Sequence, residues 1–181
     1  MVCMCTDKSC VVVTMYNRIL VPTDGSAGTN RVIDHASNLA DAHDAELQFL
    51  YVVNTASFAN LPMETSWENV TSMLRDEGEA ALQAAERRAD TDDVVTALGE
   101  GPPSKEIVDH AREEGCDLIV MGTHGRGGLN RLLLGSVAER VVRSAPVPVM
   151  TVRVGDEADE TGEEATDRNP TPDSPVGEAM E

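Results

Sequence analysis

The segment from residue 121 to residue 140, MGTHGRGGLNRLLLGSVAER, concentrates residues whose chemistry suits an anionic ligand. Glycines let a backbone take positive φ and come close to a ligand, while Arg126 and Arg131 supply positive charge. Ser136 stands where a helix is expected to begin, so its hydroxyl and the first N–H groups of that helix would point at an anion there. This combination favours an anion or nucleotide loop, and a flexible surface loop is the alternative.

Neither of the usual phosphate-binding fingerprints is present in the chain. No glycine is followed by lysine, which excludes a P-loop. Gly125 and Gly127 begin a G-x-G, but Asn130 stands where the dinucleotide pattern requires its third glycine. The elements around the loop must therefore indicate what it holds.

Short apolar runs alternate along the chain with stretches of helical periodicity. The predicted strands are residues 18–21, 46–53, 93–98, 117–122 and 146–154. The predicted helices are residues 27–43, 67–90, 105–115 and 136–144. Alternation at these lengths predicts an α/β fold, with a parallel sheet and helices on both of its faces.

In an open parallel sheet, ligands bind beyond the carboxyl ends of the strands, at the point where the strand order reverses. Two ligand-like segments occupy such positions in this sequence. The first is VPTDGS, after the first predicted strand, and the second is the glycine loop, after the fourth. We therefore expect the two segments to face one ligand.

The composition is strongly acidic and excludes several classes of partner. The 181 residues carry 32 acidic and 14 basic side chains, a net charge of -18, which repels nucleic acid phosphates and anionic lipid headgroups. No apolar run approaches the roughly 20 residues of a membrane span. We expect no nucleic acid partner and no membrane partner.

The basic residues are nearly all arginines, since only Lys8 and Lys105 are lysines. An acidic surface so poor in lysine is what we expect of a halophilic protein. The alternative is that an acidic tail alone accounts for the excess of acidic residues.

Residues 15–154 hold the alternating pattern, and the two ends differ from it. Residues 155–181 contain ten acidic residues, one arginine and three prolines, so they cannot bury enough apolar surface to fold, and an acidic disordered tail is predicted. Residues 1–14 hold three of the four cysteines, but their spacing matches no zinc pattern and no signal peptide. We expect a non-structural N-terminal extension there. Irregular cysteines without an export signal indicate a cytoplasmic protein.

Three ordered motifs resemble the ATP-binding branch of the universal stress protein family. Gly122, Gly125, Gly135 and Ser136 reproduce the pattern G-x2-G-x9-G-S, RILVPTDGS lies near the start, and APVPVMTVR lies at the end. The resemblance covers residues 16–154. It implies a Rossmann-like fold, similar to the adenine nucleotide alpha hydrolases, with five parallel strands in the order 3-2-1-4-5.

The resemblance also implies a partner, a ligand and the residues that hold it. The partner is a second copy of the chain, paired through the last strand at residues 147–153 to form a homodimer. The ligand is ATP, with Mg²⁺ or Mn²⁺ between its phosphates. Asp24 would meet the ribose, Pro22 and Thr23 would line the adenosine pocket, Val52 would offer backbone groups to adenine, and Met121 would pack nearby. The phosphates would lie against Gly122, Gly125, Arg126, Gly135, Ser136 and the Val137 amide.

Other interpretations of these residues remain open. Asp24 could cap the helix that follows it. Asp24, His124 and Ser136 could form a catalytic triad, but no strand-turn nucleophile motif surrounds Ser136, so we expect no catalysis by them.

The expected function is that of a universal stress protein that binds ATP and acts in the stress response as a nucleotide-responsive regulatory dimer, and not as an enzyme. A slow ATP hydrolase, or another adenine-nucleotide enzyme on the same fold, is one alternative. VPTDGSAGT is neither the S-G-G-x-D-S loop nor the H-I-G-H signature of such enzymes. A scaffold dimer that binds no nucleotide is the other alternative, and the intact glycine motif argues against it.

Overall fold

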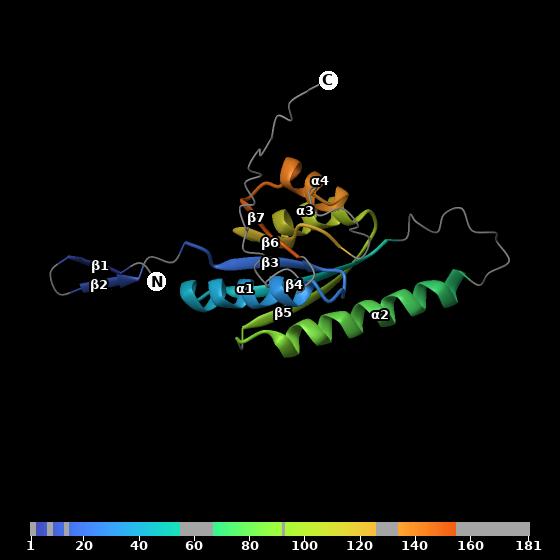
Figure 1. The fold of residues 1–181 in the computed structure, drawn as a ribbon, viewed down its shortest axis with the longest axis horizontal. Coiled ribbons are helices and arrows are strands. Elements are labelled where there is room, and N and C mark those ends of the chain that lie inside the picture. The colour runs from blue at the N-terminus through green and yellow to red at the C-terminus, as the bar shows by residue number, and fades with distance from the viewer. Residues whose placement is uncertain are drawn as a thin grey trace, which may run out of the picture.

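The computed structural model describes residues 3–6, 9–12, 15–54, 67–91, 93–125 and 134–154. Its elements are β1 (Cys3–Thr6), β2 (Ser9–Val12), β3 (Arg18–Thr23), α1 (Thr29–His43), β4 (Glu46–Val53), α2 (Trp67–Arg88), β5 (Val94–Glu100), α3 (Pro103–Glu113), β6 (Leu118–Gly122), α4 (Ser136–Ser144) and β7 (Val149–Val152) (Figure 1). In the described part of the chain, no helix combines the length and the apolar character that a membrane crossing requires.

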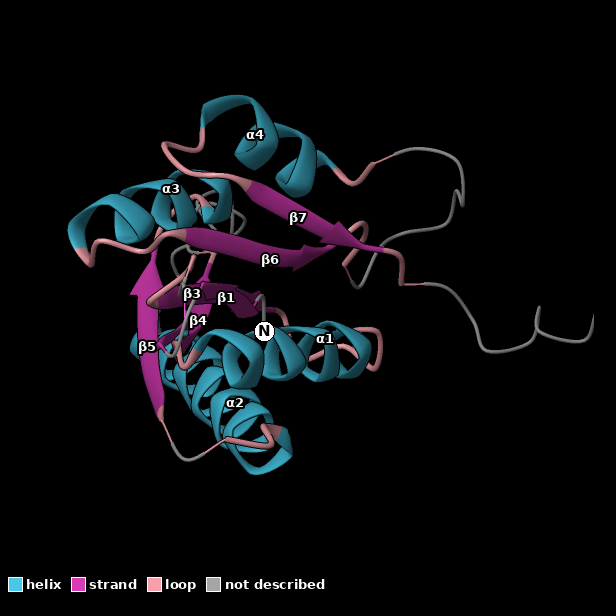
Figure 2. Ribbon diagram, turned by 90° about the vertical axis from the view of Figure 1, so that its left-hand side faces the viewer, coloured by secondary structure: helices cyan, strands magenta, loops and turns pink. Residues whose placement is uncertain are grey.

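Five strands form one parallel sheet in the order β5-β4-β3-β6-β7. Counted from β3 along the chain, this is the order 3-2-1-4-5, so the predicted fold class is confirmed. Helices α1 and α2 cover one face of the sheet, and α3 and α4 cover the other (Figures 1 and 2). The strand order reverses beside β3, which places the switch point between β3 and β6.

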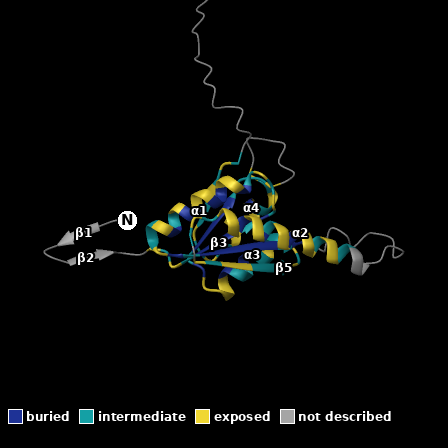
Figure 3. Cartoon of the chain, turned by 90° about the horizontal axis from the view of Figure 1, so that it is seen from below, coloured by how far each residue is buried: buried dark blue, intermediate teal, exposed yellow. Residues whose placement is uncertain are grey.

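The sheet divides the core into two layers. Its central strand β3 is drawn largely as buried in Figure 3. Successive side chains of a strand point to opposite faces, so β4 supplies both layers. Phe49 belongs to the layer under α1 and α2, and Leu50 to the layer under α3 and α4. Neither residue is more than 2% exposed, and burial on both faces explains why residues 49–53 of β4 form an unbroken apolar run in the sequence.

Strands β3 and β6 pair over only part of their length. Their register contains Ile19 with Leu118 and Leu20 with Ile119, although β3 continues to Thr23. Pro22 has no N–H to donate toward β6, which allows the two strands to separate beyond this point. The prediction that the first strand ends at Val21 was wrong, because Pro22 and Thr23 continue the pairing with β4.

Other element boundaries also differ from the prediction. Strand β7 covers only Val149–Val152 of the expected 146–154, since Pro146 and Pro148 cannot donate to a ladder and β6 ends opposite Val152. Helix α3 begins at Pro103, two residues earlier than predicted, because proline is well tolerated in the first turn.

Helix α2 approaches the sheet most closely at Gly78. A Cβ atom at this position would lie 2.7 Å from side-chain atoms of both Tyr51 and Leu98. Glycine is unfavourable inside a helix, and this close approach gives the reason for a glycine at position 78. The close approach brings Leu74 and Glu77, one turn and one residue earlier, to the edge of the site described below.

Residues 1–14 were expected to carry no structure, and two short strands are found within them. β1 and β2 pair antiparallel, with Cys5 opposite Cys10 and Met4 opposite Val11. They form a separate two-stranded sheet. The β-branched valines of this segment favour an extended backbone, a local preference that the cysteine spacing does not reveal. Residues 155–181 lie outside the described residues, so the disordered tail stays a prediction.

Asp117 joins the start of β3 to the start of β6 at the end of the sheet opposite the site. Its Oδ2 accepts hydrogen bonds from the Asn17 N–H (2.7 Å), the Asn17 Nδ2 (3.2 Å) and the Arg18 N–H (3.2 Å). These donors, the Asn17 N–H above all, lower the pKa of the Asp117 carboxyl below its ordinary value.

We expect Asp117→Ala to lower the free energy of unfolding by about 1 kcal/mol at pH 7, because the charged acceptor is lost. A lowered pKa means that this contribution is complete above about pH 4 and is lost as the pH falls through the folded-state pKa. Urea unfolding at pH 7 and at pH 3 measures it. Equal stability of variant and wild type at pH 7 would contradict the expectation, as would a difference that persists unchanged at pH 3.

Candidate functional site

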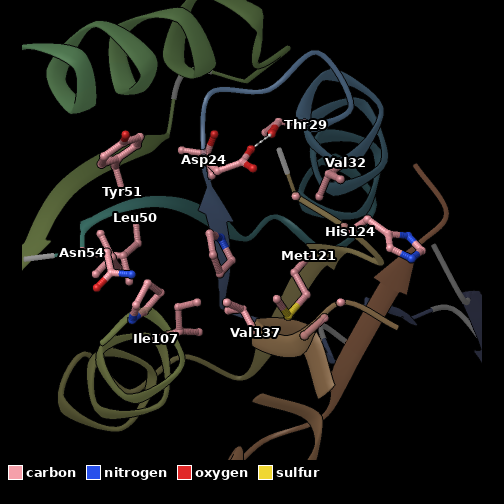
Figure 4. Close-up of a pocket in the computed structure, with 18 of the residues that line it drawn as sticks. Asp24, Thr29, Val32, Leu50, Tyr51, Asn54, Ile107, Met121, His124 and Val137 are labelled. Atoms are coloured by element: carbon pink, nitrogen blue, oxygen red, sulfur yellow. Dashed lines mark hydrogen bonds between the residues drawn. The ribbon is translucent and has the colours of Figure 1, made fainter. Parts of the chain in front are cut away.

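A cavity of about 600 Å³ lies beyond the carboxyl ends of β3, β4 and β6, at the switch point of the sheet (Figure 4). We call it the switch-point cavity. The residues predicted for the site that line it are Pro22, Thr23, Asp24, Val52, Met121, Gly122, Gly125, Gly135, Ser136 and Val137. The structure therefore brings together segments separated by about a hundred residues of sequence. Arg126 lies outside the described residues, and its role stays a prediction.

Further residues line the switch-point cavity that the sequence analysis did not assign to it. They include Thr29, Val32, Leu50, Tyr51, Asn54, Leu74, Glu77, Ile107, Thr123, His124 and Val154. The apolar members read as ordinary core residues, because a cavity wall and a core position show the same periodicity in sequence. Asn54 is different, since it is a polar residue directly after a buried strand, and that position was itself a usable signal.

The backbone of Val52 faces β3, as the hydrogen bonds at the start of β4 show. The Glu46 N–H donates to the Asn17 carbonyl on the side of β3, and the Leu47 N–H donates to the Asp93 carbonyl on the side of β5, each over 2.9 Å. Backbone groups of a strand point alternately to its two neighbours. Val52 follows Glu46 by an even number of residues, so its N–H and carbonyl point toward β3.

The carbonyl of Val52 extends past the end of the β3–β4 ladder. The register ends with Thr23 opposite Tyr51. The Gly25 N–H, the next donor that could continue the ladder, donates instead to the Thr23 Oγ1 over 3.1 Å. The Val52 carbonyl thus offers an acceptor at the wall of the switch-point cavity, among apolar side chains such as Met121 and Val137.

Asp24 is held in the turn between β3 and α1. Its Oδ1 accepts hydrogen bonds from the Ser26 N–H (3.0 Å) and the Thr29 Oγ1 (3.1 Å) (Figure 4). Helix α1 begins after Gly28 with no side-chain capping bond, so Asp24 does not serve as its N-cap. The carboxylate is instead positioned toward the glycine loop that follows β6.

Gly125 and Asp24 approach each other so closely that no side chain fits between them. A Cβ atom on Gly125 would lie 2.7 Å from the Asp24 Oδ2. Gly122, Gly125 and Gly135 are not among the described residues with positive φ, so of the two expected properties, positive φ and close approach, it is close approach that accounts for these glycines.

We expect Gly125→Ala to weaken ATP binding about tenfold, because the carboxylate must leave its place and a charge-assisted hydrogen bond to the ligand is lost. Calorimetry of the folded variant measures this. Gly99→Ala is the matched control, because a Cβ there meets its nearest neighbour at an ordinary 3.6 Å. Equal affinity of Gly125→Ala and Gly99→Ala for ATP would contradict the placement of Asp24 at the ligand.

The start of α4 offers hydrogen-bond donors to the switch-point cavity. The Gly135 N–H donates to the Thr123 carbonyl (2.8 Å), and the first bond along the helix runs from the Glu139 N–H to the Gly135 carbonyl (2.8 Å). The N–H groups of Ser136 and Val137 precede that first bond, and both residues line the cavity. With the positive end of the helix dipole, they form an arrangement suited to an anion.

His124 is not connected to Ser136 as a catalytic triad would require. Its Nδ1 lies 3.1 Å from the Thr123 Oγ1, and its Nε2 has no hydrogen-bond partner among the described residues. The Thr123 Oγ1 also accepts the Val154 N–H over 3.3 Å. The described bonds therefore place His124 in the packing between the loop and the end of β7.

The described residues contain no group of three or more histidine, cysteine, aspartate or glutamate side chains arranged to hold a metal ion. Among the described residues, Asp24 and Glu77 are the acidic side chains that line the switch-point cavity. A divalent cation at this site would thus depend on ligands other than a cluster of protein side chains.

Sequence comparison identifies the family. Residues 15–153 match the universal stress protein family. Universal stress protein MJ0531 of Methanocaldococcus jannaschii is 45% identical over 141 residues, which are 77% of this chain and 83% of that protein. The chain belongs to the universal stress protein family. Its expected membership is confirmed.

Solved structures of universal stress proteins share the fold. The universal stress protein UspA from Lactobacillus plantarum superposes with a TM-score of 0.64 at 32% identity, covering 76% of this chain and 98% of that one. A universal stress protein solved in complex with cAMP gives a TM-score of 0.62 at 29% identity, covering 78% of this chain and 99% of that one. An adenine nucleotide is therefore bound by at least one related universal stress protein.

Proposed function

We propose that this universal stress protein binds ATP in the switch-point cavity. We further propose that it acts in the cytoplasm as a nucleotide-responsive regulator in the stress response. One observation carries the proposal. A single cavity of about 600 Å³ combines apolar walls, the positioned Asp24 carboxylate and the N–H groups at the start of α4. Small-molecule sites of this kind have volumes between about 300 and 1,000 Å³. The related structure with cAMP supports an adenine nucleotide as the class of ligand.

The proposed orientation of ATP follows the chemistry of the walls. Adenine lies among Val52, Met121 and Val137, where its exocyclic amino group reaches the Val52 carbonyl. The ribose hydroxyls donate to Asp24. The phosphates extend toward the start of α4, where backbone N–H groups favour negative charge.

A bound Mg²⁺ or Mn²⁺ would be carried by the phosphates and completed by water, because Mg²⁺ usually keeps several waters and binds through substrate phosphates. Asp24 is the acidic side chain of the β3–α1 turn that lines the same cavity. The cation would offset the repulsion between the ATP phosphates and the acidic chain.

The proposed role is regulation and not catalysis. His124 has no hydrogen bond to Ser136 among the described residues, and the Thr123 hydroxyl beside its Nδ1 also accepts the Val154 N–H, which fits a packing role. Occupancy by ATP would stabilise one state of the protein, which a partner then recognises. We further propose a homodimer formed through residues 147–153, since the far edge of β7 carries no partner strand among the described residues.

Three measurements on the purified protein test this function. Mass spectrometry of the small molecules released by denaturation is expected to find an adenine nucleotide, and incubation with Mg-ATP is expected to leave the ATP intact for hours. Light scattering is expected to give the mass of two chains. Steady turnover of ATP would favour the slow hydrolase instead, and a monomer would refute the dimer.

A further inference from the structure

Asn54 places a polar side chain in the wall of the switch-point cavity. It follows the last residue of β4 and lies beside Leu50, opposite Ile107 of α3 (Figure 4). Its Oδ1 is buried and has no hydrogen-bond partner among the described residues. Among the residues that line the cavity, His124 is the other one with such an atom, and it lies between the loop and β7.

A buried amide oxygen without a partner is unfavourable, and native structures satisfy nearly all such groups. No protein hydrogen bond to this oxygen in the described residues fixes the orientation of the amide. Rotation about its Cβ–Cγ bond can therefore turn the oxygen into the cavity without breaking a hydrogen bond. The amide then offers one acceptor and two donors to a ligand.

The position of Asn54 matches the end of the cavity where the base is proposed to lie. Side chains two residues apart on a strand share a face, and Leu50 and Val52 both belong to the layer under α3 and α4. Asn54 continues this series at the point where β4 ends. Val52 offers its carbonyl, and Asn54 its amide, to the same region of the cavity.

We propose that the side chain of Asn54 recognises the polar edge of adenine. Its Oδ1 accepts a hydrogen bond from the exocyclic amino group, and its Nδ2 donates to the neighbouring ring nitrogen, the bidentate pairing that asparagine makes with adenine elsewhere. This inference rests on the proposed binding of ATP and makes Asn54 a specificity-determining residue of that site. A purine without the amino group would leave the Asn54 oxygen unpaired.

Calorimetry with two nucleotides isolates this contact. The probes are ATP and purine riboside 5′-triphosphate, which lacks the 6-amino group and otherwise keeps the shape and phosphates of ATP. The variant is Asn54→Leu, which keeps the size of the side chain and removes both polar atoms. Asn38→Leu is the matched control, because Asn38 is exposed on α1 and its Nδ2 donates to the Asp34 carbonyl, away from the cavity.

The wild type and Asn38→Leu are expected to prefer ATP over the analogue by about tenfold, the discrimination of one good bidentate pair. In folded Asn54→Leu the preference is expected to fall at least about threefold, to the part that the Val52 carbonyl supplies, while both nucleotides lose the hydrogen bond from the Asn54 Nδ2 to the ring nitrogen. An unchanged preference in Asn54→Leu would overturn this inference and leave ATP binding standing. If the wild type bound neither nucleotide, the proposed function would fall, and this inference with it.

If Asn54→Leu does not fold, Asn54→Asp replaces it in the same titrations. This variant keeps the hydrogen-bond acceptor and loses the donor, so it is expected to weaken ATP binding.

Discussion

Gly135→Asp is expected to lower the affinity for ATP at least about 100-fold while the protein stays folded, because like charges about 4 Å apart repel by several kcal/mol near a protein surface. Gly135 precedes α4, and its N–H is bonded to the Thr123 carbonyl. The new carboxylate would stand at the positive end of the helix, where the phosphates are proposed to bind. Calorimetric titration with Mg-ATP measures the change.

Two control variants separate charge from shape. Gly135→Ala adds a Cβ at 3.2 Å from the Thr123 carbonyl oxygen without adding charge, and a loss below about tenfold is expected. Asn38→Asp adds the same charge on the exposed face of α1 and is expected to bind ATP as the wild type does. Undiminished affinity in folded Gly135→Asp would remove the start of α4 from the site.

Phe49→Ala is expected to destabilise the protein by about 3–5 kcal/mol, the usual range for a buried phenylalanine. Phe49 is fully buried at the centre of the sheet, on the face under α1 and α2, with Val21 and Thr96 as its register neighbours. The cavity left behind cannot close without moving two helices.

Urea unfolding measures this loss of stability, provided that the free energy of unfolding falls with urea concentration at the same slope in the variant and the wild type. Met73→Ala, on the exposed face of α2, is the control, and it is expected to change the free energy of unfolding by less than about 0.5 kcal/mol. A small effect of Phe49→Ala would show that the two-layer core does not carry the stability of the fold.

The strands and helices could be predicted where their periodicity was long and unbroken. The fourth predicted helix begins and ends where α4 does, and residues 46–53 form β4. The boundary errors of β3, β7 and α3 fall at prolines. Pro22 continues a strand because it pairs with β4 while its missing N–H faces β6 at the point where β3 and β6 separate, and no local rule predicts this.

The candidate site could be predicted for the residues that the sequence motifs contain and not for the rest of its lining. Asp24 and the motif glycines follow strands whose carboxyl ends meet at the switch point, so topology alone brings them together. Leu50 and Ile107 could not be distinguished from core residues, because burial gives the same pattern in both cases. The contact that explains Gly125, its approach to Asp24, depends on two loops meeting and lies beyond any sequence rule.

Some expectations from composition stay predictions. The halophilic character inferred from a net charge of -18 with only two lysines would appear as greater stability in molar salt. The acidic tail and Arg126 lie outside the described residues.

The central claim is that the switch-point cavity binds ATP, and calorimetry of the wild-type protein tests it most directly. The protein, freed of any nucleotide carried through purification, is titrated with Mg-ATP in molar KCl. We predict one site per chain with a dissociation constant in the range of about 1 μM or tighter, a binding free energy near 8 kcal/mol. An empty, folded protein that takes up no ATP would contradict the account and favour a scaffold that binds no nucleotide.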